Sequence, residues 1–120
     1  MHELSLAMSV MDVTTRQLTS RPGAVVTGLE IEVGQHSGVD LDSFRTAMNS
    51  VVRTSEWPEA EIDITVIPAE YQCLDCGHRF YTTDDGESPD LYPTCPECHA
   101  RCCLPVSGRE FRLKSLRLSV

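Results

Sequence analysis

The sequence predicts an α+β protein in which two helices lie on a small three-stranded sheet, with a four-cysteine zinc ribbon inserted before the last strand. Three observations predict this fold: segments with helical periodicity alternate with strand-like segments, all six cysteines fall within residues 73–104, and an alternating run closes the chain. The length of 120 residues suits one domain with a small insert. We therefore expect an α+β domain at 1–70 plus 106–120 and a zinc-ribbon domain at 71–105.

Two helices are expected from apolar side chains that recur every three or four positions. The first is predicted over residues 3–18, and its buried face is expected to comprise Leu4, Ala7, Met8, Met11 and Leu18. It ends at a Pro-Gly stop signal. The second is predicted over residues 41–54 after a capping residue, Asp40 or Asp42, with Leu41, Phe44, Met48 and Val51 buried.

Three strands are expected from alternating apolar residues. The first covers residues 28–34 and points Leu29, Ile31 and Val33 inward, and a turn at residues 35–38 follows it. The second points Ile62, Ile64 and Val66 inward and extends to about Ala69. The third covers residues 111–120 and changes phase near Ser115, which predicts a β-bulge.

Charge and composition exclude several classes of protein. The net charge of −8 disfavours nucleic acid as a ligand, because such binding relies on a basic surface. No apolar run is long enough for a membrane span, and the N-terminus lacks the features of a signal peptide, so we expect a cytoplasmic protein. No catalytic signature is present, and we expect no enzyme activity. Cysteines in a cytoplasmic chain indicate metal ligands or redox groups rather than disulfides.

The cysteine spacing predicts a tetrahedral metal site. Cys73, Cys76, Cys95 and Cys98 form a C-x₂-C-x₁₈-C-x₂-C pattern, in which two tight turns point four sulfurs at one ion. Zinc is the expected metal, and a rubredoxin-like iron site or a dithiol redox role are the alternatives. Gly77 can adopt the positive φ that such turns often need. Cys102 and Cys103 are expected to be small, partly buried apolar side chains, with ligand substitution or oxidation as alternatives.

The N-terminus offers a second set of metal donors. The amine of Met1, the backbone nitrogen and imidazole of His2, and the amide nitrogen of Glu3 could together form a planar set of nitrogens. Such a set suits Ni(II) or Cu(II), whereas zinc prefers a tetrahedron. Taken alone, a histidine at position 2 is more often an exposed polar residue.

The chain resembles the HypA/HybF family of hydrogenase-maturation nickel chaperones over nearly its whole length. The matching segments, in order, are Met1-His2-Glu3-Leu4-Ser5, Leu29-Glu30-Ile31-Glu32-Val33-Gly34, Ser37-Gly38-Val39, Pro68-Ala69, the paired cysteine motifs, and Leu113-Lys114-Ser115-Leu116. The resemblance implies that His2 is the nickel ligand, assisted by the amine of Met1 and nearby backbone nitrogens, and that Glu3 either supports the nickel ligands without binding the metal or influences metal selectivity. It also implies that Cys73, Cys76, Cys95 and Cys98 hold structural zinc.

The resemblance further implies partners: a nickel-inserting, HypB-like GTPase and the large subunit of [NiFe]-hydrogenase, with urease as another client. Nothing in the sequence demands a homodimer, although the strand ends leave domain exchange between two copies open. Two features depart from the family pattern. His36 occupies a turn position that is usually apolar, where it could add an imidazole near the N-terminus, and Cys102-Cys103 are unusual. The alternatives from other classes are a zinc-ribbon adaptor that needs no nickel and a thiol-redox or iron protein.

Overall fold

The computed structural model describes residues 2–81 and 93–119, and its contacts divide the chain into two compact units. The first, called here the helical unit, comprises residues 1–32, 39–65 and 112–120. The second, the ribbon unit, comprises residues 33–38 and 66–111 and contains all six cysteines. The predicted α+β fold is confirmed. Among the described residues, no helix is long and apolar enough to cross a membrane.

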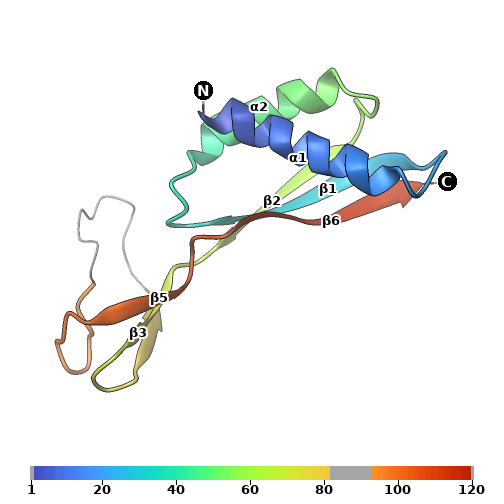
Figure 1. Cartoon of the computed structure of the whole chain (residues 1–120). Helices are drawn as coiled ribbons and strands as arrows, with labels where there is room; N and C mark the ends of the chain where they lie inside the picture. Colours follow the sequence, from blue (N-terminus) through green and yellow to red (C-terminus); the bar gives the residue numbers. More distant parts are fainter. Residues whose placement is uncertain (1, 82–92, 120) are drawn as a thin grey trace. The chain divides into compact units, whose positions relative to one another are not determined.

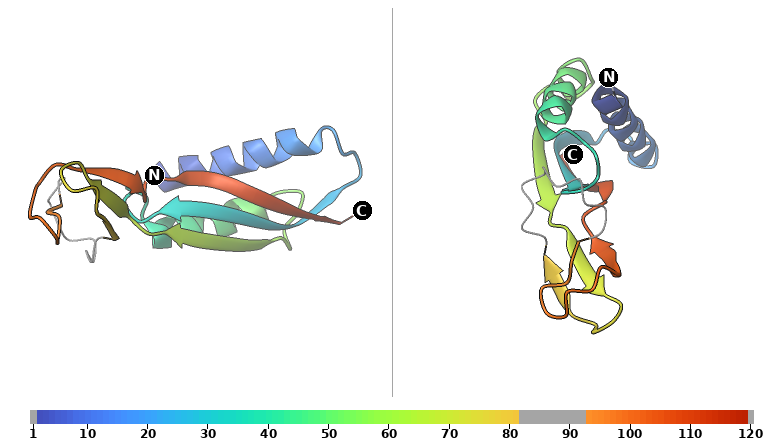
Figure 2. Two further views of the ribbon diagram at one scale, coloured as in Figure 1. Left: turned by 90° about the horizontal axis from the view of Figure 1, so that it is seen from below. Right: turned by 90° about the vertical axis from the view of Figure 1, so that its left-hand side faces the viewer.

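Two helices and a three-stranded sheet form two packed layers. Helices α1 (His2–Leu18) and α2 (Leu41–Arg53) lie side by side over one face of the sheet (Figures 1 and 2). The sheet has the order β2-β1-β6, with β1 (Val25–Gly34) in the centre between β2 (Glu61–Ile67) and β6 (Phe111–Ser119). The second and last predicted strands are therefore both neighbours of the first, which is the central strand of the sheet.

Helix α2 forms as its sequence predicts. Asp40 is the N-cap, and its side chain accepts a hydrogen bond of 3.1 Å from the backbone N–H of Ser43. The buried face consists of Phe44, Met48 and Val52, one helical turn apart. Val51, which the sequence places on this face, is only half-buried.

Helix α1 buries a face that overlaps the predicted one only in part, since Ala7 is buried as expected and Met11 and Leu18 are half-buried. Its buried residues are Ala7, Val10 and Thr14, whereas Leu4 is 42% exposed and Met8 is 56% exposed. The predicted burial of Leu4 and Met8 is therefore wrong. Thr14 can be buried because its hydroxyl donates a hydrogen bond of 2.8 Å to the carbonyl oxygen of Val10, so the polar group is satisfied within the helix. Apolar periodicity alone could not find a face that includes a threonine.

The strands of this sheet are predicted well at the centre and less well at the edges. Leu29, Ile31 and Val33 of β1 are completely buried, as predicted. Val66 of β2 is 44% exposed, so its predicted inward orientation is wrong; the burial alternation of β2 breaks between Thr65 and Val66. In β6 the burial pattern shifts phase at Ser115, where the sequence pattern also shifts. The bulge expected there remains a prediction.

Opposite charges link the three strands. Arg112 of β6 pairs with Glu32 of β1. Lys114 lies 3.6 Å from Glu30, which also accepts a hydrogen bond of 2.9 Å from the hydroxyl of Ser115. One side chain spans the whole sheet. Arg117 of β6 lies over Gly28 of β1 and forms ion pairs with Glu61 and Asp63 of β2. The basic residues Arg112, Lys114 and Arg117 of the C-terminal strand are therefore paired with carboxylates of the same sheet.

The ribbon unit contains a second, small antiparallel sheet. Its order is β4-β3-β5, with β3 (Glu70–Cys73) between β4 (Arg79–Tyr81) and β5 (Cys103–Ser107). These strands are not apparent in the sequence, because three to five residues are too few to establish an apolar alternation. The buried cluster of this unit consists of Ala69, Tyr71, Cys73, Cys95 and Cys103.

A tight backbone junction joins the start and end segments of the ribbon unit. The N–H of Gly34 donates to the carbonyl oxygen of Glu110, and the N–H of His36 donates to that of Gly108, each at 2.6 Å. Gly108 has φ +108°, and a Cβ there would lie 2.6 Å from the Cα of Ala69. A Cβ on Gly34 would overlap the carbonyl group of Gly108. Both glycines are therefore required by close backbone packing.

Candidate metal centre

The four cysteines of the paired motifs converge in the ribbon unit. Their Sγ atoms all lie within 4.8 Å of one another, with Cys73 to Cys98 at 3.5 Å and Cys76 to Cys95 at 3.6 Å. A tetrahedral Zn²⁺ ion with Zn–S bonds of about 2.3 Å requires sulfur–sulfur separations of about 3.8 Å. The thiols are therefore spaced to hold one tetrahedrally coordinated metal ion.

Both motifs adopt the same turn, although their sequences differ. In the first, the N–H of Cys73 donates to the carbonyl of His78 and the N–H of Gly77 donates to that of Cys73. The second repeats this pattern with bonds from Cys95 to Ala100 and from His99 to Cys95. The fifth residue of each turn has a positive φ, +78° at Gly77 and +64° at His99. Gly77 thus behaves as predicted, while the left-handed conformation of His99 was not anticipated.

This repeat gives a prediction for the two left-handed positions. We expect His99→Gly to raise the free energy of unfolding by about 1 kcal/mol, because glycine adopts this conformation without the penalty of a Cβ. We expect Gly77→Ala to lower it by about 1–2 kcal/mol through backbone strain alone, since a Cβ there would meet no atom within 4 Å. Chemical denaturation of the metal-loaded protein measures both, and equal signs for the two variants would contradict the prediction.

The thiols differ in acidity because of their hydrogen bonds. Backbone N–H groups of Cys76 and Asp75 favour the thiolate of Cys73 and, outweighing desolvation, lower its pKa to about 6. At Cys98 the N–H of Ala100 also favours the thiolate, but the neighbouring thiol of Cys73 and desolvation raise the pKa to about 12. The four-cysteine cluster therefore holds one thiolate readily, whereas ionising further thiols is unfavourable because the negative charges repel one another. A bound cation would offset this repulsion, as expected of a metal site.

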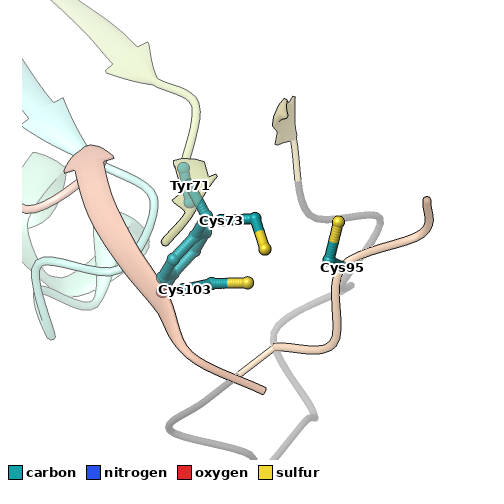
Figure 3. Close-up of a cluster of buried hydrophobic side chains, with 5 residues drawn as sticks. Tyr71, Cys73, Cys95 and Cys103 are labelled. Atoms are coloured by element: carbon teal, nitrogen blue, oxygen red, sulfur yellow. The ribbon is translucent and has the colours of Figure 1, made fainter. Parts of the chain in front are cut away.

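Each motif contributes one buried and one exposed sulfur-bearing residue. Cys73 and Cys95 are 1% and 0% exposed, whereas Cys76 and Cys98 are exposed. Of the two remaining cysteines, Cys103 is buried in the same cluster, as Figure 3 shows, and Cys102 is exposed. The expectation of two similar, partly buried side chains therefore does not fit: Cys103 begins β5 and packs in the buried cluster, whereas Cys102 precedes that strand and is exposed.

The predicted nickel residues lie at the start of α1. His2 begins the helix and is exposed, and Met1 lies outside the described residues. The carboxylate of Glu3 accepts a hydrogen bond of 3.2 Å from the backbone N–H of Asp40, the N-cap of α2. This bond is the main reason that the pKa of Glu3 is lowered; the positive N-terminus adds to it. Glu3 is therefore held as a carboxylate that ties α1 to the start of α2.

His36, which departs from the family pattern, lies in the ribbon unit. Its Nδ1 is 3.2 Å from the hydroxyl oxygen of Tyr71, and the two rings are 6.2 Å apart. Tyr71 stacks on Phe80, which in turn stacks on His78. His36 thus begins a row of packed rings, a role that an isolated turn histidine does not reveal in the sequence.

Comparisons with known proteins agree with this arrangement. Residues 1–118 match the family described as hydrogenase/urease nickel incorporation, metallochaperone, HypA. The hydrogenase maturation factor HypA of Prosthecochloris aestuarii is 35% identical, covering 98% of this chain and 99% of the relative. The HypA of Parabacteroides distasonis is 34% identical, covering 97% and 96%.

Solved structures show the same fold. A structure titled as the solution structure of HypA protein superposes with a TM-score of 0.68 at 25% identity, covering 99% of this chain and 97% of that one. The nickel metallochaperone HypA from Helicobacter pylori gives a TM-score of 0.63 at 24% identity, covering 97% and 96%, which is a likeness of fold. The chain belongs to the HypA family of hydrogenase/urease nickel-incorporation metallochaperones, and is a maturation factor rather than an enzyme.

Proposed function

We propose that the chain carries one Ni(II) ion at its N-terminus and delivers it for maturation of [NiFe]-hydrogenase. The observation that supports this most is the Met1-His2-Glu3 start within a chain that matches the family from residue 1. His2 is exposed, which suits a donor that must reach a partner. Urease is a second client consistent with the family description.

The nickel donors proposed are the amine of Met1 and the imidazole and backbone nitrogen of His2, with the amide nitrogen of Glu3 completing a planar set. The carboxylate of Glu3 has another task. By accepting the N–H of Asp40 it fixes the first turn of α1, which carries the exposed His2. A cargo site built from exposed donors can pass the ion to a partner one bond at a time. The energetic driving force for delivery would come from the partner, a HypB-like GTPase, with the large subunit of the hydrogenase as acceptor.

For the four cysteines we propose structural zinc. The sulfur separations of 3.5 and 3.6 Å fit a ZnS₄ tetrahedron. When bound, zinc supplies charge neutralisation and a cross-link between the two turns. The residues themselves provide the rest: backbone N–H groups stabilise the Cys73 thiolate, and the buried cluster holds Cys73 and Cys95 in place.

Nickel titration of zinc-loaded protein with a native, untagged N-terminus tests the nickel proposal. We expect the wild type to bind about one Ni(II) with the d–d absorbance band of a planar site, and His2→Ala to lose this band, because the imidazole is the anchoring donor. His36→Asn is the matched control and should bind like the wild type. Equal binding by the wild type and His2→Ala would place nickel elsewhere, and no binding by either would favour a zinc-ribbon adaptor.

Acidity should control nickel release. Imidazole and amine nitrogens bind metal only without their protons, so binding must displace protons. Imidazoles protonate between about pH 7.5 and 6, so nickel affinity should fall as the pH drops through this range. Calorimetric titrations at several pH values measure the change, and a constant affinity would contradict an amine and imidazole site.

A further inference from the structure

A fifth sulfur lies against the four proposed zinc ligands. Cys103 begins β5, and its Cα partner in the antiparallel β3–β5 pair is Cys73. Residues directly opposite in such a pair project their side chains from the same face, with Cβ atoms about 4.5–5.5 Å apart. Figure 3 shows the sulfurs of Cys73 and Cys103 on the same side of the two strands. Both residues are buried, at 1% and 4% exposure.

Cys103 is not needed as a ligand. The four sulfurs of the paired motifs already lie within 4.8 Å of one another and complete a tetrahedron, and Cys103 is outside that group. Within the part of the chain that the structure describes, its Sγ donates to the carbonyl oxygen of Ala100 at the long distance of 3.9 Å. A buried thiol in apolar surroundings keeps its proton. Cys103 is therefore an S–H group beside a sulfur that becomes negatively charged when metal binds.

We propose that Cys103 is a positioning residue of the metal site: when metal binds, its S–H group turns from the distant carbonyl oxygen of Ala100 and donates a hydrogen bond to the metal-bound sulfur of Cys73. This rests on the proposed zinc site in the ribbon unit. Four thiolates around Zn²⁺ leave a net charge of −2, and a donor to one of them spreads that charge. The donor also fixes the rotamer of Cys73, so that its sulfur faces the ion. Groups that hold a metal ligand in this way commonly change metal affinity ten-fold or more when removed.

The neighbouring Cys102 provides an internal control. Cys102 precedes Cys103 in the chain but is exposed. Its backbone carbonyl accepts a hydrogen bond of 2.8 Å from the N–H of Leu74. A side-chain substitution at Cys102 leaves that bond intact. Any effect that Cys103 variants share with Cys102→Ala would therefore be unrelated to the S–H group.

Serine and alanine substitutions separate hydrogen bonding from packing. Cys103→Ser keeps a donor of similar size, whereas Cys103→Ala removes it. If the thiol only filled space, serine would be the worse replacement, because it buries an additional polar group. If the thiol donates to Cys73, alanine is worse. The order of the two variants therefore distinguishes the two roles.

Zinc competition with a chromophoric chelator and cobalt substitution test the proposal on the full chain. We expect Cys103→Ala to bind zinc about ten-fold or more weakly and to shift the sulfur-to-Co(II) charge-transfer band to lower energy, because an unbonded thiolate is easier to oxidise. Cys103→Ser should remain closer to the wild type, and Cys102→Ala should match it. Wild-type behaviour of Cys103→Ala, or a greater loss for Cys103→Ser, would overturn the proposal while leaving the zinc site intact.

A measurement on the wild type keeps the test independent of variant folding. In the zinc-loaded protein, the infrared S–H stretch of Cys103, assigned by its absence from Cys103→Ala or Cys103→Ser, should lie below the frequency of a thiol without a hydrogen bond. A Cys103 band at the frequency of such a thiol would contradict the hydrogen bond. Absence of metal binding by the wild type would instead overturn the zinc site, and this proposal with it.

Discussion

We expect Cys95→Ser to unfold the ribbon unit while the helical unit stays folded. Cys95 is completely buried, and its sulfur lies 3.6 Å from that of Cys76, so the substitution removes both a ligand and part of a cluster of five residues. A segment this small buries too little apolar surface to fold without a cross-link. Structural zinc in comparable peptides contributes on the order of 10–16 kcal/mol at neutral pH. Residue-resolved amide hydrogen exchange and zinc content measure the effect.

Cys102→Ser is the matched control for this prediction. The side chain of Cys102 is exposed and outside the group of four sulfurs, so the variant should keep its metal and its amide protection. Removing zinc from the wild type with a strong chelator should reproduce the Cys95→Ser pattern of exchange. Persistence of protection in β3 and β5 after complete metal removal would show that the cluster folds without the ion.

The second large effect is expected for Gly34→Ala. A Cβ at this position would overlap the backbone carbonyl of Gly108, and the N–H of Gly34 is held by the carbonyl oxygen of Glu110 at 2.6 Å. Because the overlapping group is backbone, neither the segment at Gly34 nor the segment at Gly108 can move without breaking the hydrogen bonds between them. We expect a loss of about 3 kcal/mol or more in the free energy of unfolding, at the upper end of overpacking effects. Urea denaturation followed by circular dichroism measures it.

Gly28→Ala offers the informative comparison. A Cβ at Gly28 would also overlap another group, but that group is the guanidinium of Arg117, at the end of a flexible side chain. It can move away at the cost of its pairs with Glu61 and Asp63, both of which are exposed. Exposed ion pairs contribute at most about 1 kcal/mol, so the loss should not exceed that value. Equal losses for the two glycine variants would refute the distinction between backbone and side-chain overlap.

The elements that could be predicted are those whose side chains repeat with a clear period. Helix α2 and the centre of β1 have regular apolar positions, and the structure buries Phe44, Met48, Leu29 and Ile31 as expected. Helix α1 was predicted less well. Ala7 is buried as expected, but Leu4 and Met8 are exposed while Val10 and Thr14 are buried. Thr14 can be buried because its hydroxyl bonds within its own helix.

The metal centre was predictable for a different reason. The spacing within each C-x₂-C motif is a local constraint, and the pairing of two such motifs is recognisable without tertiary information. The identity of the family followed from residues distributed over the chain. Neither source of information could assign Cys103 to the neighbourhood of Cys73, since thirty residues separate them in sequence and the register of two short strands brings them together.

By itself, the sequence determined the α+β class, the four convergent cysteines and the family, because each depends on periodicity, spacing or motifs that lie along the chain. Only the tertiary structure decided which face of α1 is buried, that His99 takes the left-handed conformation of Gly77, and that Glu3 holds the N–H of Asp40. These features depend on which backbone segments meet, and long-range packing decides that beyond any local propensity.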